Sequence, residues 1–240
     1  MMNDTETKIP SRKCFIGLFD ILGFKDLVKN DHLEEVYRVF LRVRNLINDS
    51  KAMAGHLEAL LEKNVVTVVN YSDTFLIYTL DINNIEQDRI DRTFHAILAA
   101  CDSLFIGANE NELPIRGAIT VGDIILSDDV VIGKPIAEAY KLGQQQEWIG
   151  CRVSKEALWR ISDEAIDGHI KELAIIEYEI PCKNGKVEKM FAYNWTISLP
   201  FQKGDFRILN KRGRVDWTVE RKHRNTWEFI KYLKSNLQSA

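Results

Sequence analysis

The sequence predicts an α+β fold built on a ferredoxin-like βαββαβ palm, with extra strands and a helix at its C-terminal end. Two observations carry this prediction. Apolar residues recur at helical spacing over residues 27–47 and 89–105. Short β-type runs stand beside these segments, so that the order is strand, helix, strand, strand, helix, strand. That order is typical of a split βαβ unit, whose mainly antiparallel sheet is expected to carry its helices on one face.

The first strand is expected over residues 13–19, behind a loose leader at residues 1–12. Its apolar run ends at Asp20, and a turn at Gly23 leads into a helix near Lys25. A carboxylate at the end of a buried strand is costly unless something neutralises it. A bound cation is one neutraliser; the alternative is that Asp20 caps the helix that follows.

A second lone carboxylate stands in the same kind of place. Residues 65–80 are typical of two strands joined by a tight turn, and Asp73 lies at its tip. On a ferredoxin-like sheet the first strand and the central hairpin are neighbours, so Asp20 and Asp73 are expected at the same end of the sheet. Two carboxylates there can hold two Mg²⁺ or Mn²⁺ ions about 3.5–4 Å apart, which suits in-line phosphoryl chemistry.

The later segments complete the palm and add a periphery. A strand over residues 114–121 is expected to turn at Gly122 and Asp123, before a hairpin at 123–132 and a helix at 135–143. The remaining expected elements are a strand at 151–153, a helix at 154–161 that Ser154 caps, strands at 173–180 and 186–195, and a helix at 219–237.

Composition predicts one domain at residues 13–200, with a basic extension at residues 201–240 packed on it. The 240 residues are 45% hydrophobic, enough for one full core. The extension holds ten Lys or Arg and four Asp or Glu, a charge of +6; because the whole chain carries −3, the rest carries −9. A basic segment on an acidic body is typical of an intramolecular clamp, a subunit contact or a polyanion site. Nucleic acid is not an expected partner, because no aromatic platform is interleaved with the basic clusters.

The remaining residue counts exclude several classes of protein. The four cysteines are far apart in the sequence and are expected to be reduced, buried thiols of a cytoplasmic protein. The five histidines show no zinc-binding spacing. No run of about 18 apolar residues occurs, and the N-terminus lacks the apolar core of a signal peptide, so no membrane span is expected.

Four motifs resemble those of the class III nucleotide cyclases. The segment from Phe19 to Phe24 resembles their first metal motif, and Tyr71-Ser72-Asp73 resembles the hairpin that carries their second metal-binding Asp. Residues 116–122 resemble the strand that follows, and residues 133–142 resemble a later helix motif. The resemblance covers residues 13–155.

This resemblance implies a nucleotide cyclase with two Mn²⁺ or Mg²⁺ ions, held by Asp20, Asp73 and the backbone carbonyl of Ile21. One ion would lower the pKa of the ribose 3′-hydroxyl for in-line attack on the α-phosphate. The second would neutralise the triphosphate as pyrophosphate leaves. Substrate contacts are expected from the turn after the first strand, whose amides can bind phosphate, and from the hairpin: Phe19, Leu22, Gly23, Phe24, Val69 and Tyr71.

The sequence departs from the adenylyl and guanylyl enzymes at three positions. Ala137 and Lys141 stand where those enzymes place Asn and Arg, and Val69 stands where they place the Lys or Glu that reads the purine. The pattern is more similar to the bacterial pyrimidine cyclases of the Pycsar antiphage system. This similarity implies that CTP or UTP is converted to a cyclic monophosphate, a second messenger read by a separate effector. It also implies a homodimer with active sites at the subunit interface.

Alternatives stay open at several residues. Lys141 either replaces the missing Arg as a phosphate cation or lies on a solvated helix face. Tyr71 either contacts the base or packs across the hairpin, and Arg116 either forms a structural salt bridge or contacts substrate. For the chain as a whole, the alternatives are a catalytically silent cyclase-like domain that senses or scaffolds, and a purine cyclase. A palm that joins two nucleotides is disfavoured, because the Gly-Gly-acidic-acidic-Phe motif of diguanylate cyclases is missing.

Overall fold

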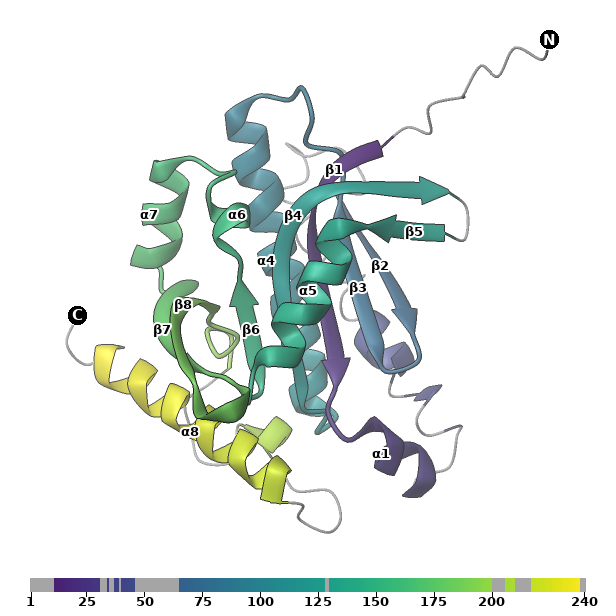
Figure 1. Ribbon diagram of the computed structural model, residues 1–240, viewed down its shortest axis with the longest axis vertical. Helices are drawn as coiled ribbons and strands as arrows, with labels where there is room; N and C mark the ends of the chain where they lie inside the picture. Colours follow the sequence, from purple (N-terminus) through teal and green to yellow (C-terminus); the bar gives the residue numbers. More distant parts are fainter. Residues whose placement is uncertain are drawn as a thin grey trace.

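The computed structural model describes residues 11–30, 34, 37–38, 40–45, 65–127, 130–199, 206–209 and 217–237. This part of the chain contains one eight-stranded sheet in the order β2-β3-β1-β4-β6-β8-β7, with β5 paired to β4 (Figure 1). The strands are β1 (Ser11–Ile21), β2 (Val66–Tyr71), β3 (Thr74–Thr79), β4 (Ile115–Ser127), β5 (Val130–Gly133), β6 (Gly150–Val153), β7 (Ile175–Pro181) and β8 (Val187–Tyr193). All pairs are antiparallel except β4 with β6. The predicted α+β class and βαββαβ order are confirmed.

Helices cover both faces of this sheet (Figure 1). On one face lie α4 (Gln87–Glu110), α6 (Lys155–Leu158) and α7 (Asp163–Lys171); on the other lie α5 (Lys134–Gln145) and α8 (Trp217–Leu237); α1 (Phe24–Asn30) follows β1. The expectation of one-sided cover applies to the helices of the palm; α5 and α8 lie outside the palm, and their cover of the other face was not predicted. The physical reason is that both faces of the central strands carry apolar side chains, and each face needs cover.

The alternation of β1 decides which side chains meet which helix. Phe15 and Phe19 pack edge-on against aromatic rings of α4, with ring centroids 5.1 and 5.9 Å apart. Ile16 and Leu18 instead belong to a second apolar cluster that contains Ala139 of α5. Because successive side chains of a strand point to opposite faces, Asp20 lies on the face of α5.

The described residues correct one predicted turn. Gly122 and Asp123 were expected to end the strand, but β4 continues through them to Ser127. The reason lies in the partner strand: β1 already begins at Ser11, so Cys14 and Lys13 pair with Gly122 and Asp123 and extend the ladder. Pairing with a neighbour outweighs the local turn preference of these two residues.

Two serine caps divide the segment after β6 into two helices. Ser154 caps α6 as predicted, and its hydroxyl accepts the Ala157 amide at 3.2 Å. However, α6 ends at Leu158, and Ser162 caps a further helix, α7, in the same way. Of the predicted helix at 27–47, residues 31–33, 35–36, 39 and 46–47 lie outside the described residues, and all the described ones, 27–30, 34, 37–38 and 40–45, are helical.

Candidate active site

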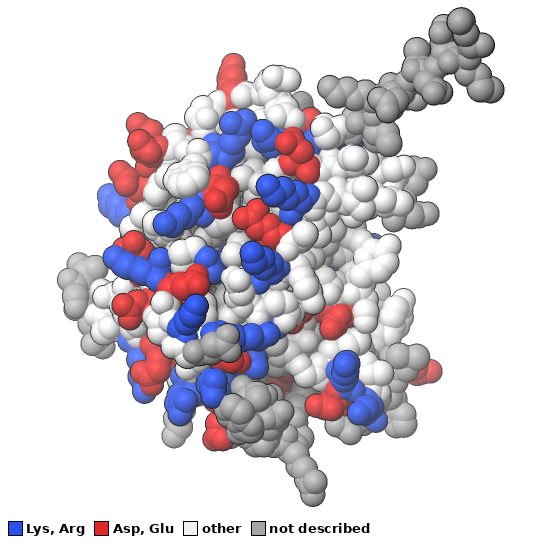
Figure 2. All heavy atoms as spheres, in the orientation of Figure 1, with Lys and Arg blue, Asp and Glu red and all other residues white. Residues whose placement is uncertain are grey.

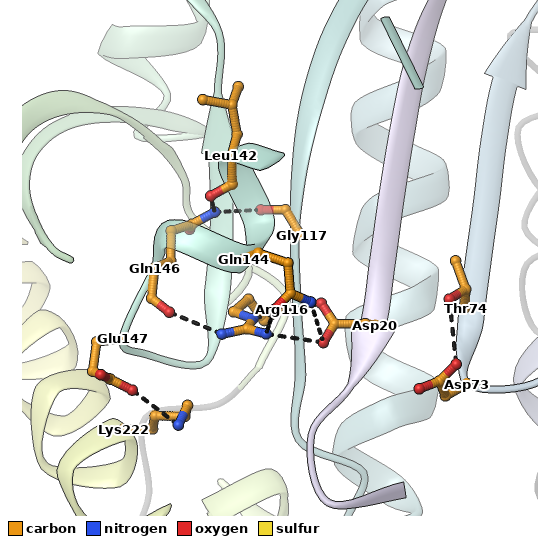
Figure 3. Close-up of polar contacts among 10 residues, drawn as sticks. All are labelled: Asp20, Asp73, Thr74, Arg116, Gly117, Leu142, Gln144, Gln146, Glu147 and Lys222. Carbon is orange, nitrogen blue, oxygen red and sulfur yellow. Dashed lines mark hydrogen bonds and ion pairs between the residues drawn. The ribbon is translucent and has the colours of Figure 1, made fainter. Parts of the chain in front are cut away.

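The register of the sheet brings Asp20 and Asp73 to the same end. Asp20 is paired with Thr74 of β3 on one side and with Arg116 of β4 on the other. Asp73 stands in the β2–β3 turn directly before Thr74, and its carbonyl accepts the Ile21 amide at 2.9 Å. In Figure 3 the Asp20 carboxylate points toward Arg116 rather than toward Asp73. The backbones of the two aspartates are therefore neighbours, while their carboxylates face different partners.

Arg116 neutralises the Asp20 carboxylate. Its Nη2 lies 3.1 Å from Oδ2 of Asp20, and its Nε lies 3.5 Å from Oδ1 (Figure 3). The Arg116 side chain is only 5% exposed and that of Asp20 is 21% exposed. Of the two sequence alternatives for Arg116, the salt bridge is the one observed.

Two glutamines complete the surroundings of Arg116. Gln144, at the end of α5, accepts Nη2 of Arg116 on Oε1 at 3.0 Å and donates Nε2 to Asp20 at 3.5 Å. The backbone carbonyl of Gln146 accepts Nη1 of Arg116 at 3.0 Å. The guanidinium is therefore held by a carboxylate, a side-chain amide and a carbonyl together (Figure 3).

The fully buried side chain of Gln146 forms hydrogen bonds with residues of β4, of α5 and of the segment that follows α5. Its Nε2 donates to the carbonyls of Gly117 and Leu142, each at 2.9 Å. Its Oε1 accepts the indole Nε1 of Trp148 at 2.7 Å. All the polar atoms of this amide have partners, as a buried polar group requires. Sequence analysis missed both Gln144 and Gln146; the only signal is a run of three glutamines after an amphipathic helix.

A close backbone approach lets Asp20 sit beside α5. A Cβ on Gly117 would lie 2.2 Å from the Leu18 carbonyl oxygen, so β4 requires glycine there. A Cβ on Gly143 of α5 would lie 3.5 Å from Cα of Gly117 and 4.0 Å from Oδ1 of Asp20. Beside Asp20 remains a cavity of about 10 Å³, bordered by Thr74 and Tyr140 among others. Such a space holds about one water molecule.

A larger groove opens next to Thr74. Its volume is about 340 Å³, and its lining is mainly apolar: Leu18, Tyr71, Thr74, Leu76, Val130, Val131 and Ile136. The walls come from β1, the β2–β3 hairpin, β5 and α5. In Figure 2 the surface over β5 and the hairpin, on the right of the view, carries few charges. The groove therefore joins an apolar surface to the end of the sheet where Asp20 and Asp73 lie.

The hairpin residues predicted to contact substrate have different exposures. The pairing of Val69 with Leu76 and of Tyr71 with Thr74 is regular, so Val69 and Tyr71 lie on the same face of β2. Val69 packs against the apolar cluster that contains Leu76. Tyr71 is 65% exposed and lines the groove. Tyr71 is thus available to a ligand in the groove.

The residues around the turn after β1 lie in more varied surroundings. The Phe19 ring is buried in the core against α4, so it is not available to a ligand. The amides of Ile21 and Leu22 donate to the carbonyls of Asp73 and Pro114. Gly23 is exposed with φ +77°, a conformation that glycine adopts readily. The Phe24 ring packs against that of Phe40 at 5.9 Å.

The two departures on α5 face the solvent. Ala137 and Lys141 are both exposed. Among the described residues, Lys141 has no ion-pair partner within reach. Lys141 stands one helical turn before Gln144, so it lies on the same side of α5 as a residue that contacts Asp20.

The oxygen atoms at these strand ends are of the kind that binds a divalent cation. Within the described ranges no group of three or more His, Cys, Asp or Glu residues converges on a common point. Asp20 and Asp73 are the two carboxylates that the register of the sheet places at these strand ends. Carboxylate and carbonyl oxygens are the ligands that Mg²⁺ and Mn²⁺ prefer. The Asp20 side chain is partly exposed and Asp73 is half-buried, so both can be reached from solvent. Because Arg116 contacts both oxygens of Asp20, an ion there would share that carboxylate with the guanidinium.

The four cysteines offer no alternative chemistry. All are free and buried. Burial raises the pKa of the Cys14 thiol to about 12, and it also raises the pKa values of Cys101, Cys151 and Cys182. A thiol is a weak nucleophile until it loses its proton, so none of these residues is suited to covalent catalysis.

Comparisons with known proteins give only structural likenesses. No protein-family model and no curated protein sequence matches the chain. The chain is similar to the guanylate cyclase domain of RhGC from Catenaria anguillulae, solved with GTP, at 13% identity over 76% of this chain and 97% of that one, with a TM-score of 0.47. It is similar to the adenylyl cyclase CyaB from P. aeruginosa at 14% identity, over 82% and 97% of the two chains, with a TM-score of 0.47. An adenylate/guanylate cyclase/hydrolase from Silicibacter pomeroyi is 18% identical over 77% and 97%, with a TM-score of 0.46. Likeness at this level assigns no activity, so function must be argued from the site residues.

Proposed function

We propose that this chain is a metal-dependent nucleotide cyclase, which converts a nucleoside triphosphate into the 3′,5′-cyclic monophosphate and pyrophosphate. The observation that carries the proposal is the meeting of Asp20 and Asp73 at the ends of adjacent strands, next to a groove of about 340 Å³. Small-molecule sites commonly have volumes of about 300–1,000 Å³. The motif resemblance in the sequence supplies the reaction class.

Asp20, Asp73 and the carbonyl of Ile21 would hold Mg²⁺ or Mn²⁺. When bound, such ions activate the ribose hydroxyl and neutralise the triphosphate. The chain itself supplies fixed positive charge: Arg116 stands beside Asp20, and Lys141 is proposed to reach the phosphates from α5. A charge that is already in place need not be reorganised during the reaction, which is why such groups stabilise transition states.

The turn after β1 is proposed to bind phosphate through backbone amides. The amides of Ile21 and Leu22 already donate within the protein, so the proposal rests on Gly23 and Phe24. Gly23 has no side chain to obstruct a ligand, and a Cβ added there would meet nothing within 4 Å. An anion could approach this turn closely.

The substrate is proposed to be CTP or UTP. Val69 and Leu76 make their face of the hairpin apolar, and there a purine edge would leave polar atoms unpaired. Each unpaired buried atom costs about 1–3 kcal/mol. The Tyr71 hydroxyl, at the groove, can pair with either pyrimidine edge. A purine triphosphate is the alternative substrate.

A homodimer is proposed as the active form, and the groove is proposed to lie at the subunit interface. Four large apolar or aromatic side chains are at least half exposed around this part of the surface: Tyr71, Val130, Ile132 and Tyr140. The same surface carries few charges in Figure 2. Association of two copies would remove these side chains from water. The cyclic product is proposed to act as a messenger in antiphage defence, read by a separate effector. No helix in the described part of the chain could cross a membrane.

A catalytically silent cyclase-like domain is the second candidate. The observation that favours it is the exposed pair Ala137 and Lys141, where the purine enzymes carry Asn and Arg. Incubation of the protein with each nucleoside triphosphate and Mn²⁺, followed by mass spectrometry, separates the two functions. A cyclic monophosphate supports the enzyme; nucleotide binding with no cyclic product from any triphosphate supports the silent domain.

A further inference from the structure

A segment without regular structure connects the candidate site to the C-terminal helix. Residues 146–149 link α5 to β6. On its inner side, the Gln146 carbonyl accepts Nη1 of Arg116. On its outer side, the same segment lies against α8. The carbonyl of the next residue, Glu147, accepts Nδ2 of Asn225 on α8 at 2.6 Å. Consecutive carbonyls of this segment therefore contact Arg116 and α8.

The closest contacts that α8 makes to this segment come from one face of the helix. The segment is also held from β7, because the Glu147 amide donates to the Pro181 carbonyl at 2.8 Å. The Ile149 amide donates to Oγ1 of Thr226 at 2.9 Å. Nζ of Lys222 lies 2.9 Å from Oε1 of Glu147, and both of these side chains are mostly buried. Phe229 packs edge-on against Trp148 with ring centroids 4.7 Å apart. These α8 residues are spaced as helix neighbours at three, four and seven positions, so they form a single stripe.

Part of the basic charge of the C-terminal extension lies beside an acidic side chain of the preceding domain. Lys222 forms a close ion pair with Glu147, and Nη1 of Arg221 lies 3.9 Å from the same carboxylate. Glu147 is only 9% exposed. A buried carboxylate without a partner would be strongly destabilising, so this pair favours one docked position of α8.

We infer that α8 positions Arg116. Asn225 and Thr226 hold residues 146–149 in place through hydrogen bonds, and the Gln146 carbonyl in turn holds the guanidinium beside Asp20. Asn225, Thr226 and Gln146 are positioning residues, since none of them contacts Asp20. A shift of α8 would carry the Glu147 carbonyl with it. The Gln146 carbonyl and Nε2 would then lose their contacts to Arg116 and Gly117. As a role in catalysis, this inference rests on the proposed cyclase function.

The test is a matched pair of substitutions at one buried position. Thr226→Val keeps the shape of the side chain but removes the hydroxyl that accepts the Ile149 amide, whereas Thr226→Ser keeps the hydroxyl. Lys231→Ala is the control on α8, because Lys231 is exposed and pairs only with Glu228 among the described residues. Each full-length variant is assayed below its unfolding temperature. The ¹⁵N NMR signal of the Arg116 Nε–H group, assigned by its loss in Arg116→Lys, reports the guanidinium directly.

We expect Thr226→Val to shift or broaden the Arg116 signal and to lower kcat/KM about tenfold, as loss of a hydrogen bond to a charged group would. Thr226→Ser should restore both readouts, and Lys231→Ala should change neither. An unchanged Arg116 signal in Thr226→Val would overturn the inference, because α8 would then only cover the core. If the wild-type protein forms no cyclic product, the proposed function fails. The NMR comparison still decides whether α8 positions Arg116.

Discussion

The guanidinium of Arg116 lies 3.1 Å from the carboxylate of Asp20, across two paired strands and almost out of contact with water. Breaking a buried ion pair by removing one partner is strongly destabilising, because the other charge stays behind. Asp20 therefore has two roles at once: it balances a buried cation and it is a proposed metal ligand. Asp73 makes no ion pair with any described residue, so its role does not include that balance.

This asymmetry predicts different stabilities for two isosteric variants. Asp20→Asn should lower the free energy of unfolding by about 2 kcal/mol, since Arg116 keeps a hydrogen-bond acceptor but loses its counter-charge. Asp73→Asn should change that free energy by less than about 0.5 kcal/mol, because Asp73 is only half-buried and has no ion-pair partner among the described residues. Urea unfolding followed by circular dichroism measures both. Equal losses in the two variants would mean that the ion pair contributes nothing to stability.

Lys141 is predicted to act on the phosphates. Lys141→Ala should lower kcat about 10²–10³-fold, the usual loss for one transition-state donor. The fold should be unaffected, because Lys141 is exposed on α5. Lys134→Ala is the control, since Lys134 is an exposed lysine on the same helix. Equal rates in the wild type and Lys141→Ala would place Lys141 on a merely solvated helix face.

The proposed dimer predicts which exposed apolar residue matters. We expect a dimer in sedimentation at micromolar concentration. Ile132→Asp should produce monomers without cyclase activity, because a charge on β5 would be buried at the interface. Val187→Asp, at an equally exposed position on β8, should remain dimeric and active. A fully active wild-type monomer would contradict the assembly.

A competition assay with all four nucleoside triphosphates in one reaction measures the base preference. The apolar face around Val69 predicts that cyclic CMP or cyclic UMP exceeds the purine products by about tenfold to a hundredfold, the discrimination expected from one or two unpaired polar atoms. Mass spectrometry of the products gives the ratio. If cyclic AMP or cyclic GMP dominates, the argument from Val69 is wrong, although the cyclase reaction itself would stand.

His169 predicts a dependence of stability on pH. Burial of His169 lowers its pKa, and the neighbouring His95, whose ring centroid lies 5.7 Å away, lowers it further; Glu172 and Asp91 act in the opposite direction. The unfolded chain then takes up a proton more readily than the folded one, so stability is full above about pH 6.5 and falls as the pH drops below it. His169→Phe should flatten the fall in unfolding temperature between pH 7 and pH 5. An identical slope in this variant would show that other groups cause it.

Local sequence patterns predicted the parts of the fold that depend on neighbours in the chain. Short apolar runs ending in turns indicated β1, the 65–80 hairpin and the placement of a carboxylate at each strand end, and Ser154 marked a helix start. The continuation of β4 through Gly122 was not predictable in this way, because it depends on pairing with Cys14 far away in the chain. Long-range pairing decides such cases.

The surroundings of Arg116 were out of reach for the same reason. Gln144 and Gln146 lie 28 and 30 residues from Arg116 in the sequence, and no local pattern links an amide to a distant guanidinium. The two-sided cover of the sheet was also missed, since it follows from how the whole chain packs. The sequence predicted which residues carry charge at the strand ends but not which charges balance each other.

The central claim is that the carboxylates at the ends of β1 and β3 serve nucleotide cyclisation. The most direct measurement compares cyclic nucleotide formation by the wild-type protein and Asp73→Asn, with saturating triphosphate and Mn²⁺ and detection by mass spectrometry. Asp73→Asn is the sharper of the two aspartate variants, because it leaves the Asp20–Arg116 pair intact. We predict a cyclic monophosphate from the wild type and no detectable product from folded Asp73→Asn. Near-normal turnover in Asp73→Asn would contradict the account.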